Sequence, residues 1–401
     1  MRERLSTQRL STLRLSAKRL SALARHVDAA TPPGRDRGLD ALRALAILGV
    51  VGGHWLVTAL VSDGGVLRAA SPLRHQPWLA PLSWIFQTLA VFFLVGGYVA
   101  TKSHASARAH GTGRTGYRPW LAARLGRLFR PVAAVLALWT AVGTGLVLSG
   151  ADPDTVHTLV KLALSPLWFL LVFAGLTALT PLVRRLHPLW PLAVVLHVDL
   201  VRFGLDGPAR LGWVNLAAGW LVPWTLGAAW ARGELTRRSG RVLLVGGAAA
   251  AAGLVLLARY PASMVGVPGA AVSNLNPPTL AAVAFGLAQC GLAILLREPL
   301  ARWTRSPAAW AAVALTNLSA MTIFLWHQTA LMAVTALGLL ADGPLPGLHT
   351  APDGWGWVLA RLAWLPVFAV GLAVCWAAFG TYERGGGFGV GAGGVRRARR
   401  V

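Results

Sequence analysis

The feature that most constrains this chain of 401 residues is a succession of apolar stretches, each about twenty residues long and separated by segments rich in arginine. An α-helix rises about 1.5 Å per residue, so about twenty apolar residues cross the roughly 30 Å hydrocarbon core of a bilayer. The composition agrees, because 55% of the residues are hydrophobic and only 13% are charged. The sequence therefore predicts an all-α polytopic membrane protein, a bundle of about ten transmembrane helices.

The distribution of basic residues predicts the orientation of the bundle. With a cytoplasmic N-terminus, 31 of the 38 Lys and Arg residues fall in cytoplasmic segments, as the positive-inside rule requires for ten spans with both termini cytoplasmic. The basic residues behind the net charge of +24 are thus expected to set the orientation in the membrane, and no nucleic-acid partner is expected. We predict a multi-pass protein of the inner or plasma membrane, in contact with membrane lipids. The expected spans are 39–61, 78–101, 128–148, 160–183, 188–205, 211–231, 241–258, 279–296, 309–340 and 355–380.

Three regions are predicted. Residues 1–36 form a basic, low-complexity cytoplasmic tail, whose five-residue repeat of Arg-Leu-Ser does not match a helical period. Residues 37–384 form the transmembrane domain, and residues 385–401 form a tail rich in Gly and Arg. The loops between the spans are too short for a separate catalytic domain, so any chemistry is expected within or between the spans. The two cysteines lie in apolar segments, and neither a disulfide framework nor a metal site is predicted.

The first span carries ionisable side chains that a purely structural span would lack. Arg43 and His54 are eleven residues apart, which is about three helical turns, so both lie on one face, roughly 16 Å apart along the axis. Ionisable groups inside a membrane usually face a partner or a wet cavity. Asp40, one turn before Arg43, is interpreted as its local ion-pair partner. We therefore expect chemistry on this face, with His54 as a general base, because a neutral imidazole accepts a proton near pH 7.

Five segments, in order along residues 36–384, carry a resemblance to a known family. They are RGLDALRALAILGVVGGH from Arg37, VFFLVGGYVATK from Val91, WLAARLGRLFRPVAAV from Trp120, LWFLLVFAGLTALTPLV from Leu167 and IFLWHQTALM from Ile323. Together they resemble the acyltransferase-3 family of integral membrane acyltransferases, whose first helix begins with an Arg, ten intervening residues and a His. The sequence departs from many relatives at Phe173 and Ala174, where an acidic pair is common, and at Gln328 and Thr329, where an aromatic residue and a proline are common.

The resemblance implies an O-acyltransferase (EC 2.3.1) that moves an acyl group, expected to be acetyl, from cytoplasmic acyl-CoA to a hydroxyl group. The acceptor would be a glycan or lipid of the bacterial cell envelope or a small secondary metabolite. The donor is acyl-CoA, and no metal is implied. The basic segments suit its phosphates, because guanidinium groups bind phosphate oxygens bidentately. The candidate catalytic residues are His54 and His327, and the candidate donor-binding residues are Arg43, Asp40, Arg127, Arg130 and Trp168.

Other interpretations remain open for the same residues. His54 and His327 could be packing residues that hydrogen-bond between helices, and Arg43 could extend to the membrane interface. Glu383, at the end of the last span, is interpreted as an interface residue. A transporter or lipid scramblase would also suit ten spans with internal polar residues, although no repeat of five spans is present. A scaffold without activity is the third possibility.

Overall fold

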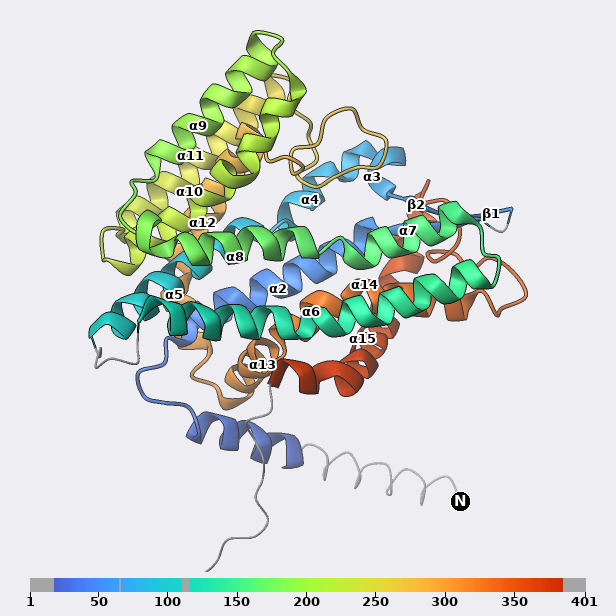
Figure 1. Cartoon of the computed structure of the whole chain (residues 1–401), viewed down its shortest axis with the longest axis horizontal. Coiled ribbons are helices and arrows are strands. Elements are labelled where there is room, and N and C mark those ends of the chain that lie inside the picture. The colour runs from blue at the N-terminus through green and yellow to red at the C-terminus, as the bar shows by residue number, and fades with distance from the viewer. Residues whose placement is uncertain (1–17, 65, 110–115, 385–401) are drawn as a thin grey trace, which may run out of the picture.

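The computed structural model describes residues 18–64, 66–109 and 116–384, and almost all of its regular structure is helical (Figure 1). The short elements are β1 (Ala59–Asp63) and β2 (Val66–Ala70), which pair antiparallel, and η1 (Pro77–Leu79), η2 (Leu200–Gly204) and η3 (Ala209–Trp213). The helices are α2 (Arg37–Val57), α3 (Pro72–His75), α4 (Ala80–Phe86), α5 (Leu89–Ala109), α6 (Tyr117–Leu148), α7 (Pro153–Leu164), α8 (Leu167–Val183), α9 (Leu189–Asp199), α10 (Val214–Ala231), α11 (Arg237–Leu256), α12 (Leu280–Trp303), α13 (Pro307–Leu318), α14 (Ala320–Gly338) and α15 (Trp355–Arg384).

The predicted all-α polytopic class is confirmed, with eight segments of the described chain that are long and apolar enough to cross a membrane. The two expected spans outside these eight are 188–205 and 211–231. The first corresponds to α9, which has only 11 residues before it continues into η2. The second corresponds to α10, which is buried over nearly its whole length between Ala218 and Ala231. A helix that is hydrophobic all round is typically one that is buried, and α10 is enclosed by its neighbours in the bundle.

Three spans that the sequence predicts as single helices are broken in the structure. Span 78–101 is divided between α4 and α5 at Gln87 and Thr88, and span 309–340 is divided between α13 and α14 at Ser319. Span 160–183 is divided between α7 and α8 immediately before Leu167, where Pro166 lacks the N–H that a continuous helix needs. The Thr88 hydroxyl at the first break donates a hydrogen bond to the Ala46 carbonyl of α2 at 2.7 Å, which ties this break to α2.

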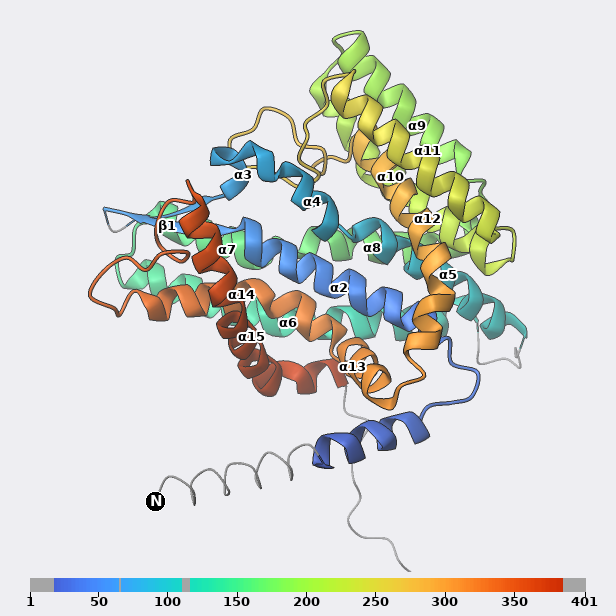
Figure 2. The same ribbon diagram turned by 180° about the vertical axis from the view of Figure 1, so that it is seen from behind.

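Helix α2 lies in the interior of the bundle and packs against α5, α12 and α14 (Figures 1 and 2). Its glycines permit this contact: a Cβ atom on Gly53 would lie 2.9 Å from the Phe86 side chain of α4. The absence of a side chain at Gly53 therefore lets α4 approach α2 closely. Gly97 of α5 has the same use, because a Cβ atom there would lie 2.1 Å from the Trp224 carbonyl oxygen of α10.

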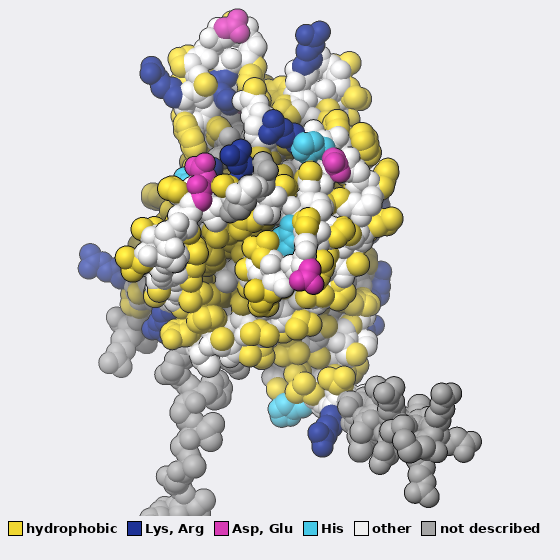
Figure 3. Space-filling view, turned by 90° about the vertical axis from the view of Figure 1, so that its right-hand side faces the viewer, with side chains coloured by type: hydrophobic (Ala, Val, Ile, Leu, Met, Phe, Trp, Pro, Cys, Tyr) yellow, Lys and Arg dark blue, Asp and Glu magenta, His cyan; other side chains and the backbone are white. Residues whose placement is uncertain are grey.

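The end of α15 lies at the end of the bundle opposite the β1–β2 hairpin, where Glu383 contacts the start of α14 (Figure 2). Residues 18–29, predicted as part of a tail without a helical stripe, are helical in the structure, and Val27 packs beside Trp310 of α13. Asp28 also forms an ion pair with Arg37 at 2.7 Å. The remainder of the predicted N-terminal tail and the predicted tail 385–401 lie outside the described residues. The hairpin end carries scattered charges of both signs (Figure 3).

Candidate active site: a cationic cavity and a histidine pair

A cavity of about 1220 Å³ opens at the end of the bundle where α2 begins. Side chains from α2, α5, α6, α8, α14 and the end of α15 line it, together with residues before α2 and at the end of α13. We call it the entry cavity. Its charged and amide-bearing lining residues are Arg35, Asp36, Asp40, Arg43, Arg124, Arg127, Asn317 and Glu383.

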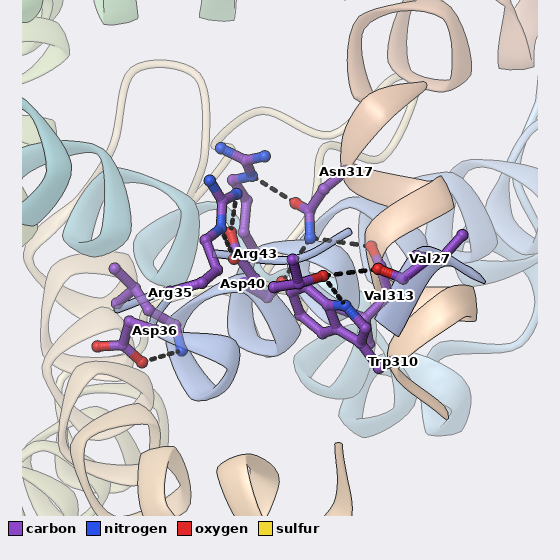
Figure 4. Close-up of polar contacts among 10 residues, drawn as sticks. Val27, Arg35, Asp36, Asp40, Arg43, Trp310, Val313 and Asn317 are labelled. Carbon is purple, nitrogen blue, oxygen red and sulfur yellow. Dashed lines mark hydrogen bonds and ion pairs between the residues drawn. The ribbon is translucent and has the colours of Figure 1, made fainter. Parts of the chain in front are cut away.

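Arg43 reaches the entry cavity from the second turn of α2. Its Nε atom donates to Oδ1 of Asn317, and the amide nitrogen of Asn317 donates in turn to the Asp40 carbonyl at 2.8 Å and to the Val313 carbonyl at 3.0 Å (Figure 4). Asn317 thus ties α13 to α2 and holds one edge of the guanidinium group. Of the three guanidinium nitrogens of Arg43, only Nε has a hydrogen-bond partner within the described residues. The two terminal nitrogens are therefore available to a ligand in the cavity.

The ion pair expected between Asp40 and Arg43 is not the one observed. Arg35, which precedes α2, makes a two-point contact with the Asp40 carboxylate instead (Figure 4). Asp36 caps the start of α2 by accepting from the Leu39 N–H at 3.0 Å, and it pairs with Arg297 at 2.6 Å. Asp40 therefore neutralises Arg35, and Arg43 forms no ion pair within the described residues.

Helix α6 adds two more arginines to the entry cavity. Arg124 donates to Ser103 of α5 and lies over the Trp120 ring, 5.2 Å from its centroid. Arg127 is exposed, and its Nε donates to the Ala123 carbonyl at 3.2 Å. Arg130 is exposed too, but it is not a lining residue. Arg43, Arg124 and Arg127 form no ion pair within the described residues, and their charges make this end of the cavity attractive to anions.

Glu383, expected as an interface residue, caps a helix inside the cavity. Its carboxylate accepts from the backbone N–H groups of Met321 and Thr322 at 2.9 Å each, and from the Thr322 hydroxyl at 2.6 Å. These are orphan donors of the first turn of α14, where a negative charge also interacts favourably with the helix dipole. The end of α15 therefore fixes the start of α14, the helix that carries His327.

Replacing Glu383 with alanine should destabilise the protein. Loss of a capping interaction of this kind typically costs about 0.5–2 kcal/mol. We expect a lower Tm for Glu383→Ala in detergent, measured by the fluorescence of the 18 tryptophans. Glu298→Ala is the matched control, because Glu298 is exposed and pairs with exposed Arg237. Equal Tm values for the two variants would contradict the capping role.

Aromatic rings close the inner end of the entry cavity. Phe92, Phe169 and Phe324 all line it, with ring centroids 5.1 Å apart for Phe92 and Phe169 and 5.2 Å apart for Phe169 and Phe324. We call these three residues the aromatic floor. Trp168 is not a lining residue; it packs edge-on against Phe169 at 6.2 Å, behind the floor.

The two candidate catalytic histidines lie together beyond the aromatic floor. The rings of His54, from α2, and His327, from α14, have centroids 5.0 Å apart, and Phe324 lies 6.1 Å from the His327 ring. Nδ1 of His327 contacts the Phe324 carbonyl at 2.6 Å, so this nitrogen donates and Nε2 is left as a bare acceptor. Nε2 of His327 is buried and has no partner within the described residues. We call His54 and His327 the histidine pair.

Neighbouring residues fix the histidine pair in place. Trp55 of α2 donates from its indole nitrogen to the His327 carbonyl at 3.0 Å. Arg361 of α15 is buried and donates to three carbonyls: Trp55 at 2.6 Å, Gly347 at 2.8 Å and Thr58. Arg361 therefore satisfies the last carbonyls of α2, just after His54, which would otherwise be orphaned inside the bundle. Arg361 is not among the site residues predicted from the sequence.

The structure thus divides the predicted site residues into three groups. Arg43, Asp40 and Arg127 meet in the entry cavity, and His54 and His327 meet behind the aromatic floor. Arg130 and Trp168 lie outside the cavity lining. His54 is not a lining residue either, so the continuous path expected from Arg43 to His54 is closed by aromatic rings in this conformation.

The structure is a helical bundle of the multi-pass membrane type, with a cationic cavity at one end and two imidazoles in its interior. The chain belongs to the acyltransferase-3 family, whose model, described as an acyltransferase domain, matches residues 36–380. Comparison with curated proteins and with solved structures found no match. The family match confirms the resemblance and makes the protein a membrane acyltransferase.

Proposed function

We propose that the protein is an O-acyltransferase of the bacterial inner membrane, which moves an acetyl group from cytoplasmic acetyl-CoA to a hydroxyl group of an envelope glycan, a lipid or a small metabolite. The observation that carries this proposal is the placement of charge around α2. Arg43 of α2 and Arg124 and Arg127 of α6, which have no ion-pair partners in the described chain, line the cavity where α2 begins. His54 of the histidine pair lies about three turns further along α2.

The entry cavity suits the nucleotide end of an acyl-CoA. Its phosphates need several cationic donors, and the terminal nitrogens of Arg43 face the cavity beside Arg124 and Arg127. Guanidinium groups bind phosphate bidentately, and the low dielectric of a partly enclosed site strengthens each contact. Asp40 contributes by holding Arg35 and, through its backbone carbonyl, Asn317. The role of Arg130 in donor binding stays a prediction, in which its exposed charge attracts the donor from solvent.

The pantetheine arm then leads from the cavity toward the histidine pair. An extended arm is comparable in length to the roughly 16 Å of helix between Arg43 and His54. Because Phe92, Phe169 and Phe324 close this route, the thioester reaches His54 only when these rings change rotamer. Trp168 supports Phe169 from behind, so its proposed role is to shape the donor path without contacting the nucleotide.

The chemical step needs one proton acceptor and one carbonyl. His54 removes the proton of the acceptor hydroxyl, the oxygen attacks the thioester carbonyl, and a carbon–oxygen bond forms. The carbon–sulfur bond then breaks, and the thiolate of CoA receives the proton from His54. His327 offers a bare Nε2 beside this centre, which suits it to accept a hydrogen bond from a neighbouring hydroxyl or N–H group of the acceptor and so orient the acceptor toward His54.

The test is a transfer assay with purified protein in nanodiscs. Acetyl-CoA labelled in its acetyl group is supplied with lipid and polysaccharide extracts, and mass spectrometry compares these extracts from a deletion strain and its parent. We expect release of CoA that depends on the extract, and a mass increase of one acetyl group in an acceptor of the parent strain. Absence of CoA binding, together with altered lipid distribution in the deletion strain, would favour a transporter or scramblase instead.

A further inference from the structure

Gln328 makes the side-chain hydrogen bond of His54. Its amide nitrogen lies 3.1 Å from Nδ1 of His54, and Gln328 is itself fully buried, with 1% of its surface exposed. The neighbouring residue on α14 is His327, whose carbonyl binds Trp55 of α2. The register between α14 and α2 is therefore fixed on both sides of the contact, and Gln328 cannot move away from the imidazole without disturbing the bundle.

The orientation of this amide decides which nitrogen of His54 carries the proton. If the NH₂ group faces Nδ1, it donates, and the neutral ring holds its proton on Nε2. If the carbonyl oxygen faces Nδ1, it accepts from Nδ1–H, and Nε2 is bare. A half-turn of the amide exchanges the two arrangements without moving either helix. The opposite end of the amide, Oε1, is buried without a partner within the described residues, so it does not lock the side chain in one orientation.

Base catalysis by His54 is compatible with only one of the two orientations. A general base needs a bare nitrogen before the reaction, and it carries protons on both nitrogens afterwards. With Nδ1 occupied by Gln328, the reacting atom is Nε2. The resulting imidazolium then presents Nδ1–H to Gln328, which only the carbonyl oxygen can accept, because an NH₂ group would oppose a second donor.

We propose that Gln328 is the positioning residue of His54: its carbonyl oxygen accepts from Nδ1–H, leaves Nε2 bare for the acceptor hydroxyl, and holds the imidazolium after proton transfer. This inference rests on the proposed function for its catalytic meaning, whereas the tautomer itself is measurable without activity. A neutral amide performs this role without adding a buried negative charge beside the histidine, which would stabilise the protonated ring and leave less of it in the neutral form that can accept a proton.

The decisive measurement is the tautomer of His54 in the full-length protein. Histidine labelled with ¹⁵N is incorporated, the protein is placed in nanodiscs, and a difference spectrum against His54→Gln assigns the two ring nitrogens. We expect a protonated Nδ1 and a bare Nε2. A proton on Nε2 in the wild-type protein would overturn the proposal, whatever the activity of any variant.

Two substitutions give the kinetic counterpart. Gln328→Met keeps the volume but removes the hydrogen bond, and we expect kcat to fall about 10- to 100-fold, as for other residues that orient a functional histidine. Gln328→Glu can only accept from Nδ1–H, so activity should return above the Met variant, with the acid limb of the pH–rate profile displaced to higher pH. Gln289→Met is the matched control, because Gln289 on α12 is a partly buried amide bonded to the Gln87 carbonyl.

The outcomes separate this inference from the proposed function. Equal kcat and pH profiles for wild type, Gln328→Met and Gln328→Glu would overturn the positioning role. If Nδ1 of His54 is protonated in the wild-type protein and not in Gln328→Met, the hydrogen bond to Gln328 is supported. If His54→Ala then retained full transfer, the proposed base role of His54 would fail while the hydrogen bond would still stand.

Discussion

His54→Ala should lower kcat for acetyl transfer by about 10²- to 10⁴-fold, the usual contribution of a positioned general base. The substitution leaves the entry cavity intact, because His54 does not line it, so the affinity for CoA should change little. The measurement is transfer of labelled acetyl groups by the purified variant in nanodiscs, with CoA affinity determined in parallel by calorimetry.

His157→Ala is the control for that experiment, since His157 is an exposed histidine on α7 outside the site. It should keep the wild-type kcat. A value of kcat for His54→Ala close to that of the control would remove His54 from the chemical step. A loss of CoA affinity equal to the loss of kcat would show instead that the substitution had disrupted the fold around α2.

Arg43→Ala should weaken binding of CoA by about 10- to 100-fold, because a hydrogen bond to a charged group contributes about 1.5–3 kcal/mol. Arg43→Lys should recover only part of this affinity, since an ammonium group lacks the planar fork that binds phosphate. The measurement is calorimetric titration of CoA into nanodiscs at two salt concentrations. The wild-type affinity should fall more steeply with salt than that of the alanine variant.

The control for the charge change is Arg305→Ala. Arg305 is exposed, follows α12 in the sequence and is not a cavity residue. It should leave both the affinity and its salt dependence unchanged. Equal effects of the two substitutions would mean that Arg43 acts through the overall charge of the protein, and the entry cavity would not be the donor site.

The sequence predicts the class of fold because apolar length and arginine placement are direct consequences of the bilayer. It does not predict the breaks at Gln87 and Ser319, since hydropathy measures the environment of a segment and not the continuity of its helix. The short α9 shows the same limit: eleven helical residues followed by a π-type turn have the hydropathy of a longer span.

Within the site, helical periodicity places Arg43 and His54 on one face of α2, and the structure assigns one to the entry cavity and the other to the histidine pair. Periodicity within one helix contains no information on partners from other helices. Asn317, Gln328 and Glu383 were visible as polar residues in or beside apolar spans, which is the available signal for a functional position. Their contacts with α2 and α14 come from tertiary packing alone.

The buried guanidinium of Arg361 has a consequence for how the protein is assembled. Arg361 lies in the second turn of α15, and a charged side chain in a membrane-spanning helix is costly unless it is paired. The carbonyls that compensate it belong to Trp55, Thr58 and Gly347. Two of these three lie some three hundred residues earlier in the chain. Insertion of α15 into the lipid is therefore coupled to its docking onto the end of α2, a segment made long before it.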